Sequence, residues 1–353
     1  MNQSEGMEQF LSWKSSIAIV ILAILILAGF LGIYYVALDV PVHTTRVETQ
    51  IGDASLFRGS SGNFLLTASI QNIGTETVSL SAQLQNQGFL VPNGTFSQPV
   101  INSGKTSTYF SDVPQVGQFD GSTGAVRVPN SQSLNSSMFS IEFGVQYHSY
   151  NPDHQMIVGK GAAGGNGWYF FSYRSANVFN DFVVYVNNTR YDQELGDIFA
   201  IDKWYDVALT LDGTTISAYV NGMPVQSWKR PITFVGNNYD LTIGNCVCGG
   251  YYLNGSLAFV RQYDRAMSAH DVERNFRNPS TPVGPGLVMW LSFDTETNGI
   301  FQDRSAMGNT GIAIGGLQLT PPVSPGGIYV VTIVARTSFG VQYSISKKVS
   351  AAG

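Results

Sequence analysis

Hydrophobic and polar side chains alternate with a period of two along several stretches of the chain. The alternation is clear in residues 64–70 and 78–84. It returns near the end of the chain in residues 328–337 and 341–349, which flank a predicted turn at 338–340. A period of two is typical of a strand that buries one face. These stretches therefore predict a mainly β protein.

A different pattern occupies the N-terminal region, where residues 17–38 carry no charged side chain. As an α-helix rising 1.5 Å per residue, this run spans roughly 33 Å, which is enough to cross a bilayer. Cleaved secretory signals have a shorter apolar run. We therefore predict a leader or cytoplasmic segment at 1–14 and a retained hydrophobic helix at 15–40, which ends before Pro41.

Composition narrows the class of protein further. Charged residues make up 12% of the chain and hydrophobic residues 44%, and there are 38 glycines. This balance is typical of an exported β-rich protein whose turns use Gly, Asn and Ser. The formal charge of −5 provides no basic surface, so we expect no nucleic-acid partner.

The two cysteines, Cys246 and Cys248, are too few for a small disulfide scaffold. A local disulfide, two inert thiols and two metal ligands all remain open for this pair.

The strands at the two ends of the chain are incomplete without each other. Residues 41–115 contain about five predicted strands, which is one short of a closed sandwich, and 323–353 would supply the missing edge. Domain insertions are tolerated where the inserted ends lie close together. We therefore predict a discontinuous sandwich at 41–115 and 323–353 around a separate domain at 116–322. Alternatively, the last strands add edge strands to the domain at 116–322 and do not complete the sandwich.

The polar leader, the triplet Lys14-Ser15-Ser16 and the apolar run after it resemble the archaeal type IV pilin and archaellin family. The stretches "QNIG", "NSGKTSTYF" and "GGIYVVTIVA" resemble the Ig-like β-sandwich of those proteins. The resemblance implies prepilin-type cleavage next to Lys14, Ser15 and Ser16, and assembly with copies of the same chain through the helix. The alternative is a plain single-pass anchor.

A second set of motifs lies in 116–322. One of them, "WYDVALTLDGTTISAYVNGMPV" at 204–225, alternates as strands do and contains the hairpin turns Asp212-Gly213 and Asn221-Gly222. Ser268, followed by helix formers up to Phe276, predicts a short capped helix. With matching stretches that begin at 119, 139, 253 and 286, this region resembles the laminin G-like, concanavalin A-like jelly-roll family. The implied fold is mainly β: a hydrophobic helix, then an Ig-like β-sandwich interrupted by a jelly roll.

The jelly-roll resemblance also implies binding of glycans or cell-surface proteins through loops, often beside Ca²⁺. Asp120 in "FDG" and Asp303 in "QDRSAMGN" match positions of such Ca²⁺ ligands, although each could equally form a turn. Sugar rings stack on exposed aromatic faces. The candidate ligand-binding residues are therefore the aromatic side chains that we expect in loops, namely Tyr150, Trp168, Tyr239, Tyr251 and Tyr252.

Catalytic chemistry has little support in the sequence. The four histidines are scattered, and Glu142 lies in an alternating strand that resembles the nucleophile strands of jelly-roll glycosidases. Those enzymes need a second carboxylate within about 5–10 Å, and no E-x-D-x-x-E arrangement accompanies Glu142. We expect no enzyme activity.

Four Asn-x-Ser/Thr sequons, at Asn93, Asn135, Asn187 and Asn254, fit an exported glycoprotein. The sequence thus predicts a subunit of an extracellular type IV pilus-like filament, or a pilin-like surface adhesin. It would be membrane-bound before assembly, and its jelly roll would bind glycans. The alternative is a membrane-anchored glycan-binding receptor that forms no filament.

Overall fold

The computed structural model describes residues 46–58, 64–86, 89–90, 95–150, 154–161, 165–174, 178–320 and 327–352. Strands dominate these residues and form three sheets. Two short helices accompany them, the 3-10 helix η1 (Gln132–Leu134) and the α-helix α2 (Ala269–Arg277). The expectation of a mainly β protein is confirmed.

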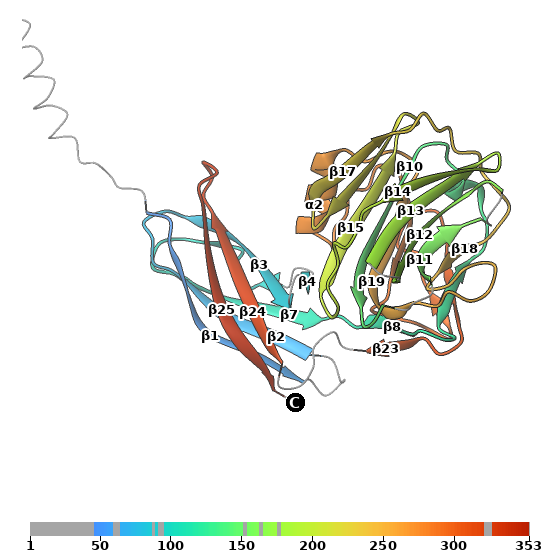
Figure 1. The fold of residues 1–353 in the computed structure, drawn as a ribbon. Coiled ribbons are helices and arrows are strands. Elements are labelled where there is room, and N and C mark those ends of the chain that lie inside the picture. Colours follow the sequence, from blue (N-terminus) through green and yellow to red (C-terminus); the bar gives the residue numbers. More distant parts are fainter. Residues whose placement is uncertain are drawn as a thin grey trace, which may run out of the picture. The chain divides into compact units, whose positions relative to one another are not determined.

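The first sheet combines strands from both ends of the described chain, and we call it the terminal sheet. Its order is β4-β3-β24-β25-β1-β2-β7-β5, with β6 paired to β3. Figure 1 shows the red strands β24 and β25 beside the blue strand β1. Its strands are β1 (Thr49–Arg58), β2 (Phe64–Asn72), β3 (Val78–Asn86), β4 (Phe89–Leu90), β5 (Thr95–Phe96), β6 (Val100–Ile101), β7 (Thr106–Val113), β24 (Ile328–Arg336) and β25 (Gln342–Ala352).

Long-range pairing holds this sheet together. Strand β24 pairs antiparallel with β3 from Arg336↔Ser79 to Val330↔Gln85, and β25 reaches β1 through a short parallel pairing at Leu56↔Ala351. Hydrophobic side chains of β1, β2 and β7 share one core with those of β3 and β24. The alternating residues of β2 and β3 point into this core, which is the physical reason for their period of two.

All remaining strands lie between β7 and β24 in the sequence and form two further sheets. The one that carries helix α2 is called the helix-side sheet, with β17-β16-β15-β10-β19-β8-β23 in order and β20 on β19. Its strands are β8 (Val116–Asp120), β10 (Phe139–Tyr147), β15 (Trp204–Leu211), β16 (Thr215–Val220), β17 (Met223–Lys229), β19 (Asn254–Tyr263), β20 (Leu287–Ser292) and β23 (Gln318–Thr320).

The third sheet is called the platform sheet, and its order is β14-β13-β12-β11-β18-β9-β22-β21. It packs against the helix-side sheet through a core of buried aliphatic and aromatic side chains from both. Its strands are β9 (Ala125–Val128), β11 (Gln155–Lys160), β12 (Gly167–Arg174), β13 (Val178–Val186), β14 (Thr189–Glu194), β18 (Leu241–Ile243), β21 (Ile300–Phe301) and β22 (Gly311–Ile314).

Local signals place the turns and the α-helix. Asn221 and Gly222 both have positive φ, 51° and 76°, as a two-residue hairpin between β16 and β17 requires. The side chain of Ser268 accepts a hydrogen bond from the Asp271 N–H, and the Asp271 side chain accepts one from the Ser268 N–H. This reciprocal cap fixes the start of α2 where the sequence predicted it.

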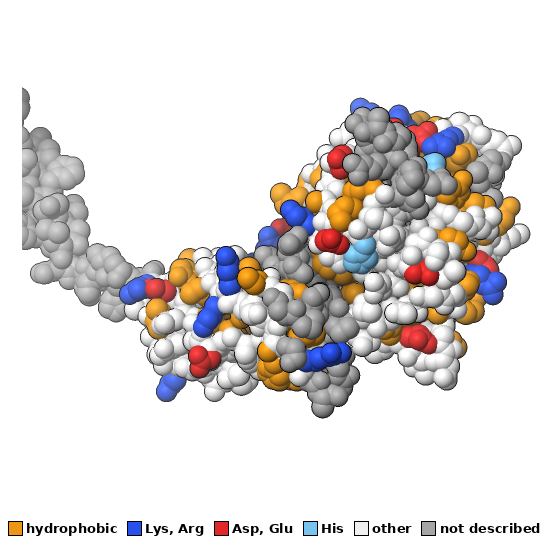
Figure 2. All heavy atoms as spheres, turned by 60° about the horizontal axis from the view of Figure 1, so that its bottom comes forward, with side chains coloured by type: hydrophobic (Ala, Val, Ile, Leu, Met, Phe, Trp, Pro, Cys, Tyr) orange, Lys and Arg blue, Asp and Glu red, His pale blue; other side chains and the backbone are white. Residues whose placement is uncertain are grey.

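Charged side chains are sparse on the surface. On the face shown in Figure 2, acidic and basic side chains are scattered among hydrophobic and uncharged polar groups. This distribution agrees with the low charged fraction of the sequence.

Candidate functional site

The outer face of the platform sheet carries aromatic and charged side chains together. Strand β12 shows how this arises, because Trp168 and Phe170 point into the core between the sheets, whereas Tyr169 and Phe171 point to the opposite face and form a separate cluster. Successive residues of a strand point to opposite faces. The sheet is therefore apolar on both sides at this point.

Strand register aligns side chains in rows across this outer face. In the first row each residue pairs with the next, from Arg127 through Thr242, Gly159, Tyr169 and Val183 to Asp192. A second row runs from Met156 through Phe171 and Asp181 to Glu194, and a third pairs Tyr185 with Arg190. We call the residues of these three rows the platform face.

Aromatic rings form the centre of the platform face. The ring centroids of Tyr169 and Tyr185 lie 5.7 Å apart, and those of His154 and Phe171 lie 4.8 Å apart. Gly159 leaves room for the Tyr169 ring, since a Cβ there would lie 3.0 Å from Tyr169 Cδ1. The rings of Tyr169, Tyr185 and Phe171 are nearly buried, so they form the floor rather than an open stacking surface.

Two exposed tyrosines lie next to this floor. Tyr239 is 46% exposed and Tyr251 is 40% exposed. The Tyr251 ring lies 5.3 Å from the ring of His154, and its carbonyl accepts a hydrogen bond from the Met156 N–H at the start of β11. Both tyrosines were predicted ligand-binding residues, and their exposure leaves their rings accessible for stacking.

A buried lysine anchors the loop that carries Tyr239. The Lys160 side chain is fully buried, and its Nζ donates to the Tyr239 carbonyl (2.7 Å), to Asn130 Oδ1 (2.7 Å), and to Asn237 Oδ1 (3.0 Å) and carbonyl (3.2 Å). Burial lowers the pKa of the Lys160 ammonium to about 8, while the Asp240 carboxylate acts in the opposite direction. Four oxygens thus surround one internal cation.

The β13–β14 edge of the platform face is rich in carboxylates. Asp181 is 4% exposed and accepts a hydrogen bond from the Gln193 N–H (2.9 Å). Burial, followed by contact with the Asp192 carboxylate, raises the pKa of Asp181 to about 7. The Arg190 guanidinium lies 2.6 Å from Asp192 Oδ1 and 3.8 Å from Asp181 Oδ2.

A disulfide closes the loop before Tyr251. Cys246 and Cys248 are bonded to each other, which settles the three alternatives that the sequence left open. The Cys246 N–H donates to the Gly250 carbonyl (3.1 Å), and Tyr251 adopts a positive φ of 54°. The disulfide and this hydrogen bond together constrain the chain that leads to Tyr251.

The other predicted aromatic residues are placed differently. Trp168 was expected in a loop, but it lies in β12, is fully buried and stacks 5.2 Å from Phe139, so this prediction is wrong. The error arose because β12 is apolar on both faces and gives no period-two signal. Tyr150 is half-buried against the core, and its hydroxyl donates to the Phe199 carbonyl. Tyr252 is half-buried.

The two predicted Ca²⁺ ligands serve as turn anchors in separate loops. Asp120 accepts hydrogen bonds from the N–H groups of Ser122, Thr123 and Gly124, and from the hydroxyls of Ser122 and Thr123. Burial opposes ionisation of Asp120, but these donors outweigh it and hold its pKa well below the usual range.

The Asp303 carboxylate likewise accepts several hydrogen bonds. The donors are the N–H groups of Trp290, Ser305 and Asn309 and the Ser305 hydroxyl. Within the described ranges, no group of three or more His, Cys, Asp or Glu side chains could hold a metal ion.

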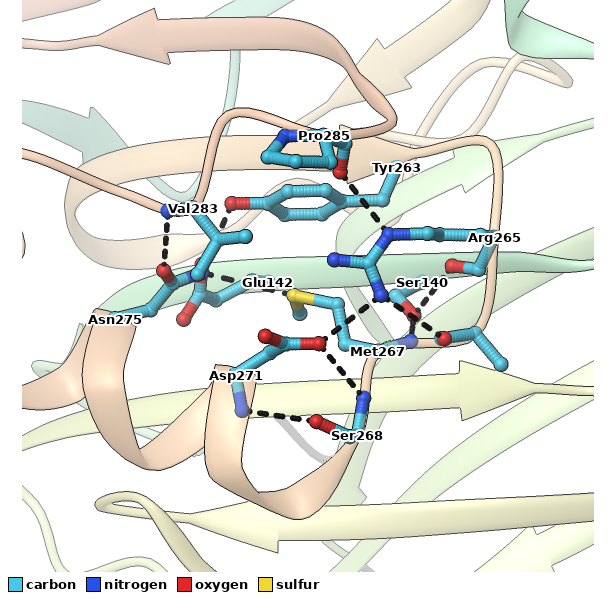
Figure 3. Close-up of polar contacts among 11 residues, drawn as sticks. Ser140, Glu142, Tyr263, Arg265, Met267, Ser268, Asp271, Asn275, Val283 and Pro285 are labelled. Atoms are coloured by element: carbon cyan, nitrogen blue, oxygen red, sulfur yellow. Dashed lines mark hydrogen bonds and ion pairs between the residues drawn. The ribbon is translucent and has the colours of Figure 1, made fainter.

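Glu142 lies under helix α2, in the polar network drawn in Figure 3. Its Oε2 accepts from Arg261 Nη1 and from Asn275 Nδ2, both at 3.0 Å, and Asn275 Nδ2 also lies 2.8 Å from the Tyr263 hydroxyl. The side chains of Glu142 and Arg261 are 0% and 1% exposed. Burial raises the pKa of Glu142, while Arg261 opposes this effect. The carboxylate therefore serves to hold α2 on the sheet.

The sequons differ in accessibility. Asn187 is exposed in the β13–β14 hairpin, whereas Asn135 Nδ2 donates to Asn130 Oδ1 (3.0 Å) and Asn254 Nδ2 donates to the Ser149 hydroxyl (2.7 Å). An acceptor amide must be free to react, so among these three only Asn187 offers one in the folded protein. Asn93 lies outside the described residues.

The predictions for the N-terminal region also lie outside the described residues, including the leader, the cleavage residues Lys14, Ser15 and Ser16, and the hydrophobic helix at 15–40. In the part of the chain that is described, no helix is long and apolar enough to span a membrane.

Sequence reasoning missed Tyr169, Tyr185, Arg190 and Asp192. The available signal was the alternation of charges in "TRYDQE" of β14, which places Arg190, Asp192 and Glu194 on one face. Period-two analysis alone does not indicate which neighbouring strands complete that face.

Comparison with protein families matches residues 120–273 to the laminin G model of the concanavalin A-like lectin/glucanases superfamily. Comparison with curated proteins found no match. Among solved structures, the chain is similar to a proposed carbohydrate binding protein from Bacteroides ovatus ATCC 8483, with 14% identity, a TM-score of 0.47, and coverage of 78% of this chain and 93% of that chain.

An SAP-like pentraxin from Limulus polyphemus shows 14% identity and a TM-score of 0.43, with 59% and 95% covered. The CBM40 of the Ruminococcus gnavus IT-sialidase, bound to α2,3-sialyllactose, shows 11% identity and a TM-score of 0.37, with 44% and 95% covered. The strand pairing and the family match over residues 120–273 support a laminin G-like, concanavalin A-like jelly-roll domain within the two sheets that form between β7 and β24.

Proposed function

We propose that this protein is a surface adhesin that binds glycans through the platform face and the adjacent Tyr239 and Tyr251. The observation that carries the proposal is the combination of two exposed tyrosines with a floor of aromatic rings and a charged edge strand. Sugar rings bind where C–H groups meet aromatic faces and hydroxyls meet fixed polar groups.

A glycan array probed with the full chain tests this function, with and without Ca²⁺. We expect binding to at least one glycan class, and we expect Tyr239→Ala and Tyr251→Ala to weaken it by about tenfold each. Phe339→Ala is a matched control, because Phe339 is 83% exposed in the turn between β24 and β25. Equal binding by all three variants would count against the site.

We also propose that the apolar segment at 15–40 displays this domain at the cell surface and joins copies of the chain into a pilus-like filament. Small residues such as Ala28, Gly29 and Gly32 would allow close helix packing in its core. Retention of the segment as a single-pass anchor is the alternative. N-terminal sequencing of the mature protein separates them, because a start at Ser15 or Ser16 indicates pilin-type processing and an intact Met1 indicates an anchor.

We infer that binding occurs without turnover. Glu142, the carboxylate that most resembles a glycosidase nucleophile in the sequence, is buried and paired with Arg261. Incubation with a panel of polysaccharides should release no reducing ends, and any sustained release would overturn this inference.

A further inference from the structure

We propose that the platform face selects neutral glycans, that is, sugars without carboxylate or sulfate groups. This inference rests on the glycan-binding function proposed above and specifies its ligand class.

Each described lysine or arginine on or beneath this face already has partners within the protein, carboxylates for the two arginines and uncharged oxygens for the lysine. Arg190 is bonded to Asp192 and lies 3.8 Å from Asp181, and Arg127 Nε lies 3.5 Å from Asp240 Oδ2. The Lys160 ammonium is enclosed by four oxygens. An anionic sugar would have to break one of these arrangements to gain a counter-charge.

Carboxylates exceed cations at the edge of the face. Asp192 and Glu194 lie on β14 beside Arg190, and the Asp192 side chain is 44% exposed. Carboxylates accept charge-assisted hydrogen bonds from sugar hydroxyls. The same excess of negative charge repels a carboxylate or sulfate on the ligand.

The floor contributes an uncharged polar partner. The Tyr169 hydroxyl is buried and has no hydrogen-bond partner among the described residues, and burial raises its pKa, so it stays a neutral phenol. A buried polar group without a partner is costly. A sugar hydroxyl can both donate and accept, so it can satisfy this group without adding charge.

An array that presents each neutral oligosaccharide beside its sialylated, uronic-acid and sulfated forms tests the selection. We expect the full chain to bind the neutral member of a pair about tenfold or more tightly at low salt, and we expect the preference to shrink as salt screens the edge charges.

The decisive variant is Asp192→Asn, which releases Arg190 from its partner. We expect this variant to bind neutral glycans more weakly and to gain affinity for the anionic member, a gain that misfolding cannot produce. Glu273→Gln is the matched control, because it breaks an exposed Arg–carboxylate pair of the same kind, Arg277 with Glu273 at 2.5 Å on α2.

Tighter binding of the anionic members by the unmodified chain would overturn this inference and leave the proposed function standing. Failure to bind any glycan would overturn both. An Asp192→Asn variant that gains no affinity for anionic glycans would also contradict the selection mechanism.

Discussion

Arg261 is a fully buried charge, and several contacts account for its position. Its guanidinium bonds Glu142 (3.0 Å) and the Pro279 carbonyl, and it lies 4.0 Å from the centroid of the Phe259 ring. The neighbouring Asp206 adds a second carboxylate, and burial, with repulsion from Glu142, raises its pKa well above the ordinary value. Arg261 therefore compensates the Glu142 carboxylate, while the raised pKa of Asp206 favours its neutral form.

Arg261→Met should destabilise the protein by about 3–5 kcal/mol, because it leaves the buried Glu142 without its counter-charge. Urea unfolding at pH 7 measures the loss. Arg277→Met is the control, since its exposed pair with Glu273 should contribute less than about 1 kcal/mol. Similar losses in the two variants would contradict the role of the buried pair.

Asp181 gives the molecule a pH-dependent stability. Its folded pKa of about 7 exceeds the ordinary 3.8, so the folded state holds the proton more tightly than the unfolded state does. The contribution of this group to stability is therefore fully present below about pH 4 and is lost as pH rises through 7.

Asp181→Asn should raise the stability measured at pH 8 by on the order of 1 kcal/mol or more, because the amide carries no charge to bury and its oxygen can still accept from Gln193 N–H. Thermal unfolding at pH 4 and pH 8 checks this, with little difference expected at pH 4. An advantage that is equal at both pH values would show that titration of Asp181 is not the cause.

At the scale of elements, the loop at 236–240 depends on a residue outside it. Lys160, at the end of β11, donates to both Asn237 and Tyr239, and Asn237 Nδ2 donates back to the Asn166 carbonyl at 3.0 Å. These bonds fix the backbone beneath the exposed Tyr239 ring. The loop has no regular secondary structure of its own between β17 and β18.

Lys160→Met keeps the length of the side chain but removes its donors. We expect a loss of about 2 kcal/mol or more, because several buried oxygens are left without a partner, and faster hydrogen exchange at residues 236–240. Lys203→Met, at an exposed turn, should change neither quantity. Unchanged exchange in the Lys160 variant would show that the loop is held by other contacts.

Element prediction succeeded where a local signal was complete. Three correct predictions each depend on a few neighbouring residues. They are the alternation in β2 and β3, the Asn221-Gly222 turn and the Ser268 cap. Element prediction failed at Trp168, because "WYFFSYR" in β12 is apolar on both faces. Such a strand gives no indication of which side chains face the core.

At the scale of the whole molecule, the last two strands are central rather than peripheral. Strands β24 and β25 lie between β3 and β1 in the terminal sheet, and Val331 and Ile333 of β24 are fully buried in its core. The terminal sheet therefore stays incomplete until the C-terminal residues of the chain have been synthesised.

Deletion of residues 327–353 should expose the hydrophobic faces of β1 to β3 and make 47–113 sensitive to protease. The platform and helix-side sheets share a separate core, so we expect 116–320 to remain protected. Limited proteolysis with mass spectrometry distinguishes the two regions. Equal protection of both would show that the tail is dispensable for the terminal sheet.

The sequence by itself determined the mainly β class, the laminin G-like motifs, the local turns and the start of α2, because these depend on periodicity and on residues close together in the chain. Only the tertiary structure decided which side chains share a face. Tyr169, Asp192 and Arg127 come from three separate strands, and their alignment follows from hydrogen-bond register between strands. Register is a long-range property, so no short window of sequence contains it.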